Sequence, residues 1–137
     1  MLTPCLLLYG CSPPELPESW PQDLPPYPGS VLTGASVKQV RGSASSGRQE
    51  LLSLELRTID DPSSVLKYYA EAAQTAGYVQ DSAATSSRPD GSVTSAFAKD
   101  RQRLELSAWN DERRTRGNTD GAIRMTKAHL ALYLPLE

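Results

Sequence analysis

A strict alternation of apolar and polar residues between Leu51 and Ile59 constrains the fold more than any other feature of the sequence. The six central residues are, in order, Leu52, Ser53, Leu54, Glu55, Leu56 and Arg57. Side chains two positions apart in a strand point to the same face, so the three leucines share one face. This pattern predicts a β-strand that buries one face against a core and exposes the other to solvent.

A helix is predicted directly after this strand. Asp60 or Asp61 can cap its N-terminus, and Pro62 occupies a first-turn position where no N–H is needed. Apolar residues then recur at helical spacing, at Val65, Leu66, Tyr69, Ala72, Ala73 and Ala76. Gly77 is expected to end the helix as its C-terminal cap.

Five further strands are predicted from their apolar and β-branched residues, over 31–40, 78–85, 93–98, 103–109 and 122–134. The resulting order, β-β-α-β-β-β-β, indicates an α+β fold in which one helix packs on a face of an antiparallel sheet. Because a single helix cannot cover six strands, the sheet is expected to curl or to leave a face exposed to a partner.

Details within these strands are also predicted. Val31, Thr33, Ala35 and Val37 are expected to share one face of the first strand. Asp90 and Gly91 form the strongest hairpin-turn signal, and a long polar loop is expected over 110–121. The apolar residues of the last strand change phase, which predicts a β-bulge near 126–128.

Residues 12–28 are predicted to form a spacer before a domain that covers 29–137. Seven of the eleven prolines lie there, at Pro13, Pro14, Pro17, Pro21, Pro25, Pro26 and Pro28. Proline at this density favours an extended backbone of about 3.1 Å per residue, so the segment spans roughly 50 Å at most. The alternative is that Trp20, Leu24 and Tyr27 pack back onto the domain.

The N-terminus contains a short apolar run that ends in a glycine and a cysteine. An apolar run ends in Leu8-Tyr9-Gly10-Cys11, and the polar, proline-rich segment follows at once. This motif resembles the lipobox of bacterial lipoproteins, in which a signal peptide is removed and the cysteine receives lipid. Tyr9 stands where the family prefers a small residue, and the apolar run is shorter than the h-region of a secretory signal, which places the true start upstream.

The resemblance implies a membrane-attached protein of the cell envelope. Residues 1–10 would be a remnant of the signal, and Cys11 would carry the lipid. Ser12 after the cysteine implies the outer membrane, with the domain facing the periplasm. The alternative is an ordinary N-terminal segment in which Cys11 has no role. Cys5 lies in the signal that would be removed, and lipid would block Cys11, so the mature domain would contain no free thiol, as suits an oxidising compartment.

Two further stretches resemble small exported proteobacterial domains of unknown function. The first is Pro26-Tyr27-Pro28-Gly29-Ser30, and the second runs from Asp61-Pro62 through Tyr68-Tyr69 to Ala76-Gly77-Tyr78. In such domains a Tyr-Pro-Gly turn leads into a sheet and a helix follows. The resemblance implies kinship of fold and transfers no activity.

The length and composition of the chain argue against several classes of function. The chain has 137 residues, which fits one domain, and a net charge of −2, which gives no reason to expect nucleic acid as a partner. No run reaches the roughly 18–20 apolar residues of a transmembrane helix. His129 is the single histidine, which leaves too few ligands for a zinc site, and no cofactor is expected.

The sequence contains no recognisable catalytic constellation. His129 lies in a leucine-rich strand and is best explained as a solvated or hydrogen-bonded strand residue. Asp60 and Asp61 are explained by helix capping, although they and Glu105 are the carboxylates on which an enzyme would depend. The candidate contact residues are therefore Trp109 and the arginines of the following loop, namely Arg113, Arg114 and Arg116.

Three function classes remain open. The first is a non-catalytic binding or accessory protein of the envelope, anchored through Cys11 and attached to a larger protein partner. The second is a small-ligand or glycan-binding module with a pocket on the sheet. The third is a hydrolase-like enzyme that uses the carboxylates.

Overall fold

The computed structural model describes residues 14–41, 47–114 and 122–135, with only the backbone for residues 112–114 and 122–124. Its elements are β1 (Val31–Arg41), β2 (Arg48–Thr58), α2 (Pro62–Thr75), β3 (Val79–Gln80), the 3-10 turn η1 (Ser82–Ala84), β4 (Ser86–Ser87), β5 (Val93–Lys99), β6 (Gln102–Arg114) and β7 (Ala122–Pro135). Residues 1–13 and 115–121 lie outside this description, and with them Cys11 and Arg116.

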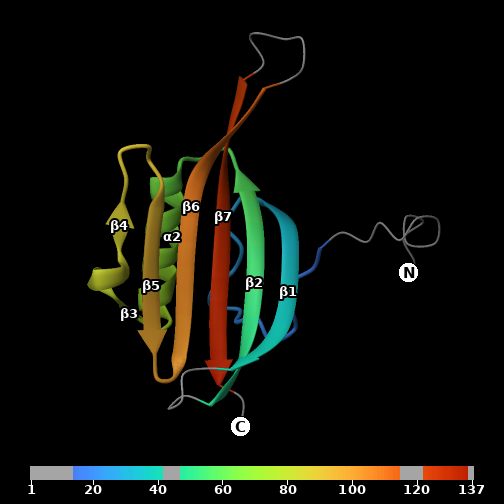
Figure 1. Cartoon of the computed structure of the whole chain (residues 1–137), viewed down its shortest axis with the longest axis vertical. Coiled ribbons are helices and arrows are strands. Elements are labelled where there is room, and N and C mark those ends of the chain that lie inside the picture. The colour runs from blue at the N-terminus through green and yellow to red at the C-terminus, as the bar shows by residue number, and fades with distance from the viewer. Residues whose placement is uncertain (1–13, 42–46, 115–121, 136–137) are drawn as a thin grey trace, which may run out of the picture.

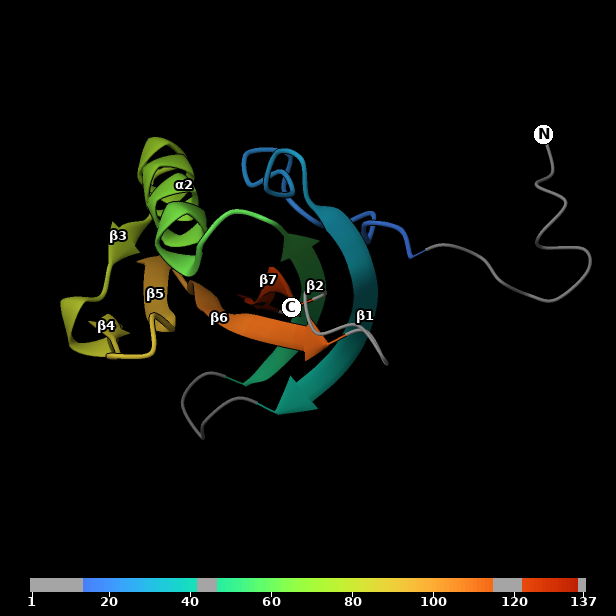
Figure 2. The same ribbon diagram turned by 90° about the horizontal axis from the view of Figure 1, so that it is seen from above.

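One open, seven-stranded sheet organises the molecule. Its order is β1-β2-β7-β6-β5-β3, and β4 pairs with β5 beside β3 (Figure 1). Every pairing is antiparallel. The single α-helix, α2, packs on one face, against β5, β6 and β7 (Figure 2). These features confirm the predicted α+β class.

The strand alternation is confirmed in the core. Leu52, Leu54 and Leu56 of β2 are buried, and they face buried residues of β7 across the register. The face that carries them also holds Leu104 and Leu106 of β6. Fully burying a leucine side chain contributes roughly 1.5–3 kcal/mol, so these leucines stabilise the fold strongly.

The ends of α2 follow the predicted signals. Asp61 is the N-cap, with an Oδ1 that accepts a hydrogen bond from the Ser64 backbone N–H at 2.9 Å, and Pro62 begins the helix. Gly77 has φ 96°, a left-handed value at which a residue without a Cβ is favoured. The Lys99 Nζ donates a hydrogen bond to the Ala76 carbonyl at 2.8 Å and so stabilises the last turn.

The proline-rich segment contributes to the core. Trp20 is 5 % exposed and Leu24 is fully buried, as in the alternative in which these residues pack onto the domain. The Trp20 Nε1 donates to the Leu24 carbonyl at 2.6 Å, and the Tyr69 hydroxyl of α2 donates to the Pro25 carbonyl at 2.9 Å. The segment lies on the same side of the sheet as α2 (Figures 1 and 2).

Four predicted details need correction. The first concerns the predicted strand over 78–85, which is broken into β3, η1 and β4. Asp81 interrupts it, because the Asp81 Oδ1 accepts a hydrogen bond from the Ala83 backbone N–H at 3.1 Å and caps the 3-10 turn. The second concerns the predicted loop over 110–121, since β6 continues to Arg114 and pairs with β7 beyond the rest of the sheet.

The third correction is that the last strand contains no bulge within its described pairing, because the β2–β7 register runs unbroken from Thr126 to Pro135. Met125 lies past the last residue of β7 that pairs with β2, so its phase need not match the core. The fourth is in β1, where a bulge lies between Leu32 and Gly34. It places Val31 opposite Arg57 but Val37 opposite Leu52, on different faces.

The packing of the N-terminal segment generates the first prediction. Replacing Leu24 with Ala should lower the free energy of unfolding by about 2–5 kcal/mol, because a fully buried side chain leaves a cavity. Urea denaturation followed by circular dichroism measures the change. Leu16→Ala is the matched control, since Leu16 is 41 % exposed and should shift stability by no more than about 0.5 kcal/mol. Equal, small effects of both variants would contradict the packing.

Candidate functional site

The face of the sheet opposite α2 carries the candidate site. Neither α2 nor the N-terminal segment covers this open face, which is the one seen in Figure 1. The alternate residues of β2, β7 and β6 point to it, because their neighbours point into the core. The central residues of the open face are Glu55, Arg57, Lys127, His129, Ser107 and Trp109.

Trp109 is a large aromatic residue of this face. It lies on β6 directly opposite Lys127 of β7, and it is 39 % exposed. A pocket of about 340 Å³ lies beside it. The other residues that line the pocket are Ser86, Arg88, Asp90, Ser92, Val93, Thr94, Ser107 and Ala108. An indole and several hydroxyl groups therefore share one concave surface of the size typical of small-ligand sites.

The turn before β5 forms one wall of this pocket. The Asp90 Oδ1 accepts hydrogen bonds from the Ser92 backbone N–H at 2.9 Å and from the Ser92 hydroxyl at 2.8 Å. These bonds hold the pKa of Asp90 below its usual value, with the backbone bond as the largest cause. Gly91 has φ 91°, which the Asp-Gly turn signal predicts. The wall therefore presents an ionised carboxylate.

A charged group lies next to Trp109 toward the end of the sheet. The Asp111 Oδ2 is 3.5 Å from the Lys127 Nζ and 4.0 Å from the Arg57 Nη2. The Nε of Arg57 is buried and has no hydrogen-bond partner within the described part of the chain. Two cations thus lie around one carboxylate beside the tryptophan.

An acid, a base and a hydroxyl lie in one cross-strand row. Glu55 pairs with His129, and His129 pairs with Ser107. No hydrogen bond in the described ranges joins these three side chains, and a Glu55 Oε1 lies over Gly34 of β1 instead. Nucleophilic catalysis requires a base within hydrogen-bond reach of the hydroxyl, so this row lacks the contact that would activate Ser107.

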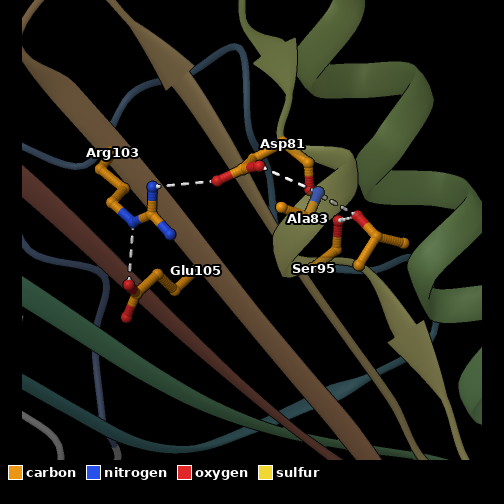
Figure 3. A network of polar contacts seen from close by, with 6 residues as sticks. Asp81, Ala83, Ser95, Arg103 and Glu105 are labelled. Atoms are coloured by element: carbon orange, nitrogen blue, oxygen red, sulfur yellow. Dashed lines mark hydrogen bonds and ion pairs between the residues drawn. The ribbon is translucent and has the colours of Figure 1, made fainter.

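A second polar network lies on the same face toward β3. The Arg103 Nε donates to the Glu105 Oε2 at 2.9 Å, and the Arg103 Nη1 is 3.6 Å from the Asp81 Oδ2 (Figure 3). Asp81 reaches across β5, where Ala96 and Ala98 leave room. All three charged side chains are partly exposed, so the network orders the edge segment and contributes little net stability.

The other candidate residues from the sequence lie in different parts of the structure. Glu105 pairs with Arg103 on the open face, whereas Asp61 caps α2 and Asp60 accepts a hydrogen bond from the Tyr27 hydroxyl at 2.5 Å. The carboxylates weighed for an enzyme therefore do not converge. The backbones of Arg113 and Arg114 extend β6 past Trp109, while Arg116 and the lipobox residues, Cys11 included, lie outside the described residues.

Within the described ranges, no group of three or more His, Cys, Asp and Glu side chains could hold a metal ion. No helix there has both the length and the apolar character to cross a membrane. Comparison of the chain with protein-family models, with curated proteins and with solved structures finds no match in any of the three. The geometry of the open face therefore has to carry the functional argument.

The Tyr27–Asp60 contact generates the second prediction. The hydrogen bond to Asp60, the largest cause, raises the pKa of Tyr27 to about 12. The folded state therefore keeps a proton that the unfolded state loses near its ordinary pKa of about 10. The stabilisation is full below pH ~10 and falls as the pH rises toward 12. Urea denaturation at both ends of this pH window measures the free energy of unfolding, and Tyr27→Phe should lose less of it than wild type as the pH rises.

Tyr69 and Tyr78 also have raised pKa values, chiefly because of burial. The wild type and the Tyr27→Phe variant should therefore both lose stability in alkali. The difference between wild type and Tyr27→Phe isolates the contribution of Tyr27. Identical losses in the two proteins would show that the Asp60 contact does not bias the titration.

Proposed function

We propose that the protein is a non-catalytic binding or accessory protein of the bacterial cell envelope, attached to the outer membrane through lipid on Cys11. The observation that carries the binding role is the open face, where a half-exposed Trp109 lies between a hydroxyl-lined pocket and the Asp111 charge group. Tryptophan and arginine are the residues that protein interfaces most favour, so this surface suits a protein partner.

The packing of the N-terminal segment supports attachment at close range. Only eight residues lie between Cys11 and Trp20 in the core, and the nine steps from one to the other span at most about 30 Å when fully extended. A lipid on Cys11 would thus hold the domain near the membrane surface. A partner that also lies at this surface would meet the open face at a high effective concentration.

The lipid anchor is tested by intact mass after expression with the native upstream DNA. The wild type should begin at Cys11 and carry the mass of a diacylglycerol and a further acyl chain, and Cys11→Ser should abolish this modification. Cys5→Ser is the matched control and should keep it, because Cys5 lies before the cleavage point. An unmodified wild-type chain would remove the anchor and the outer-membrane location.

A saccharide ligand is the second candidate function, favoured by the pocket itself. An exposed indole offers an apolar face to a sugar ring, and Ser86, Thr94 and Ser107 offer hydroxyls for hydrogen bonds. Asp90 adds an ionised acceptor. Arg88 and Asp90 line the pocket with one charge of each sign, so the arrangement fits a neutral oligosaccharide better than a polyanion.

Intrinsic fluorescence tests this candidate, because the chain has two tryptophans and only Trp109 is accessible. A panel of neutral and sulfated oligosaccharides, titrated up to about 10 mM, should change the emission with neutral members only. Ser107→Ala, which removes a hydroxyl of the pocket and keeps the Trp109 reporter, should weaken the change, while Val79→Ala, at an exposed apolar residue outside the pocket, should keep it. Unchanged emission with every sugar would exclude the pocket as a saccharide site.

A further inference from the structure

The outer edge of β1 is a second surface that the proposed function leaves unused. β1 ends the sheet and pairs only with β2, and most of its eleven residues are exposed. An edge strand of this length presents a row of unpaired N–H and C=O groups, which another strand can extend. The N-terminal segment packs on the helix side of the sheet, and its first described residues extend outward past β1 without covering the open face (Figures 1 and 2).

Most of this edge is regular. The β-bulge lies between Leu32 and Gly34, and the register with β2 is unbroken from Gly34 to Arg41. A bulge and a lysine are the usual features that keep edge strands apart. Here the bulge sits near one end of the strand, and Lys38 is the single charged residue between Val31 and Val40.

Glu55 places a negative charge at this edge. It faces Gly34 across the β1–β2 register, on the open face. Because Gly34 has no side chain, the Glu55 Oε1 lies 3.4 Å from the position that a Cβ on Gly34 would occupy. The carboxylate therefore extends over the backbone of the edge strand, toward the space that an added strand would fill.

Lys38 places a positive charge on the same edge and the same face. It pairs with Leu51, four residues along the strand from Gly34, which corresponds to about 13 Å. The two charges are thus too far apart to pair within one molecule. Neither has an ion-pair partner among the residues that the structure describes.

We propose that β1 pairs antiparallel with β1 of a second copy of this chain, on a two-fold axis that passes midway between the two copies of Ser36. In this register Gly34 lies opposite the partner's Lys38, so Glu55 and the partner's Lys38 form an ion pair on the open face, twice by symmetry. Ala35 lies opposite the partner's Val37 on the helix face, where Val37 is 49 % exposed in the single copy.

The charges select this register. Moving the axis by one residue, to Ala35 or Val37, places the partner's Ser36 or Val40 opposite Gly34 and leaves Glu55 without a cation. The axis is perpendicular to the sheet, because residues that face each other must point to the same side. The two open faces then join into one surface that carries both Trp109 side chains.

Charge exchange tests the pairing. Sedimentation equilibrium of the full chain, with reductant to keep Cys5 and Cys11 reduced, should show a reversible dimer between about 1 μM and about 1 mM. Lys38→Glu and Glu55→Lys should each weaken association at least about tenfold, since each brings like charges together. The double variant should restore it, and Lys67→Glu on the exposed face of α2 should have no effect.

Disulfide trapping tests the axis independently. In a chain with Cys5→Ser and Cys11→Ser, Ser36→Cys places two thiols opposite each other, with Cα atoms about 4.5–5.5 Å apart, within the range of a disulfide. Gln39→Cys is the matched control on the same strand, because its two copies would be offset by six residues, about 20 Å. Rapid cross-linking of Ser36→Cys alone is the expected result.

Three outcomes overturn the proposal. One is a wild-type monomer at every concentration. Another is undiminished association of Lys38→Glu, or a double variant that stays as weak as the single ones. The third is cross-linking of Gln39→Cys as fast as that of Ser36→Cys. None of these depends on lipid at Cys11 or on a ligand at Trp109, so the dimer and the proposed function fail separately.

Discussion

The fold depends on covering a sheet that is too wide for its one helix. The helix α2 has 14 residues and contacts β5, β6 and β7, which leaves the leucines of β2 in need of another cover. The N-terminal segment supplies it with Trp20 and Leu24. Ordering an irregular segment costs about 1–2 kcal/mol per residue in backbone entropy. Proline lowers this cost because it restricts the unfolded chain, so the same composition that suits a spacer also suits a fixed cover.

Covering one face leaves the other available for binding. Ala128 and Leu130 of β7 point into the core, and His129 between them points to the open face. This alternation brings both polar residues and the apolar Leu51 and Tyr133 to the open face. Trp109 also lies there, and its partly exposed indole buries nothing that the core requires. Such a residue contributes little to folding and is better explained by contact with another molecule.

Local sequence patterns predict the strands, helix caps and turns, but not the features that depend on contacts between residues far apart in the chain. The alternation of Leu52, Leu54 and Leu56, the Asp61 cap and the Asp-Gly turn are local signals, and the structure has all of them. Trp20 and Leu24 have no period, because they pack from a segment without regular structure. The extension of β6 to Arg114 was not predicted, since the four consecutive charged residues from Asp111 to Arg114 show no alternation of apolar and polar residues. The pocket at Trp109 depends on β4 and β6 both approaching β5, which no local pattern encodes.

One unpaired residue, Thr33 in the β1 bulge, determines how the side chains of this edge are arranged. Leu32 faces Leu56, and the bulge then brings Gly34, rather than Thr33, opposite Glu55. Without the bulge every later side chain of β1 would change face, because the side-chain period of a strand is two. Lys38 would then face Glu50 on the helix side, and Val37 would lie on the open face. The glycine would no longer lie under the Glu55 carboxylate, which would meet the side chain of Thr33. The bulge therefore determines which charges reach the edge, and with them whether this strand repels a second copy or pairs with it.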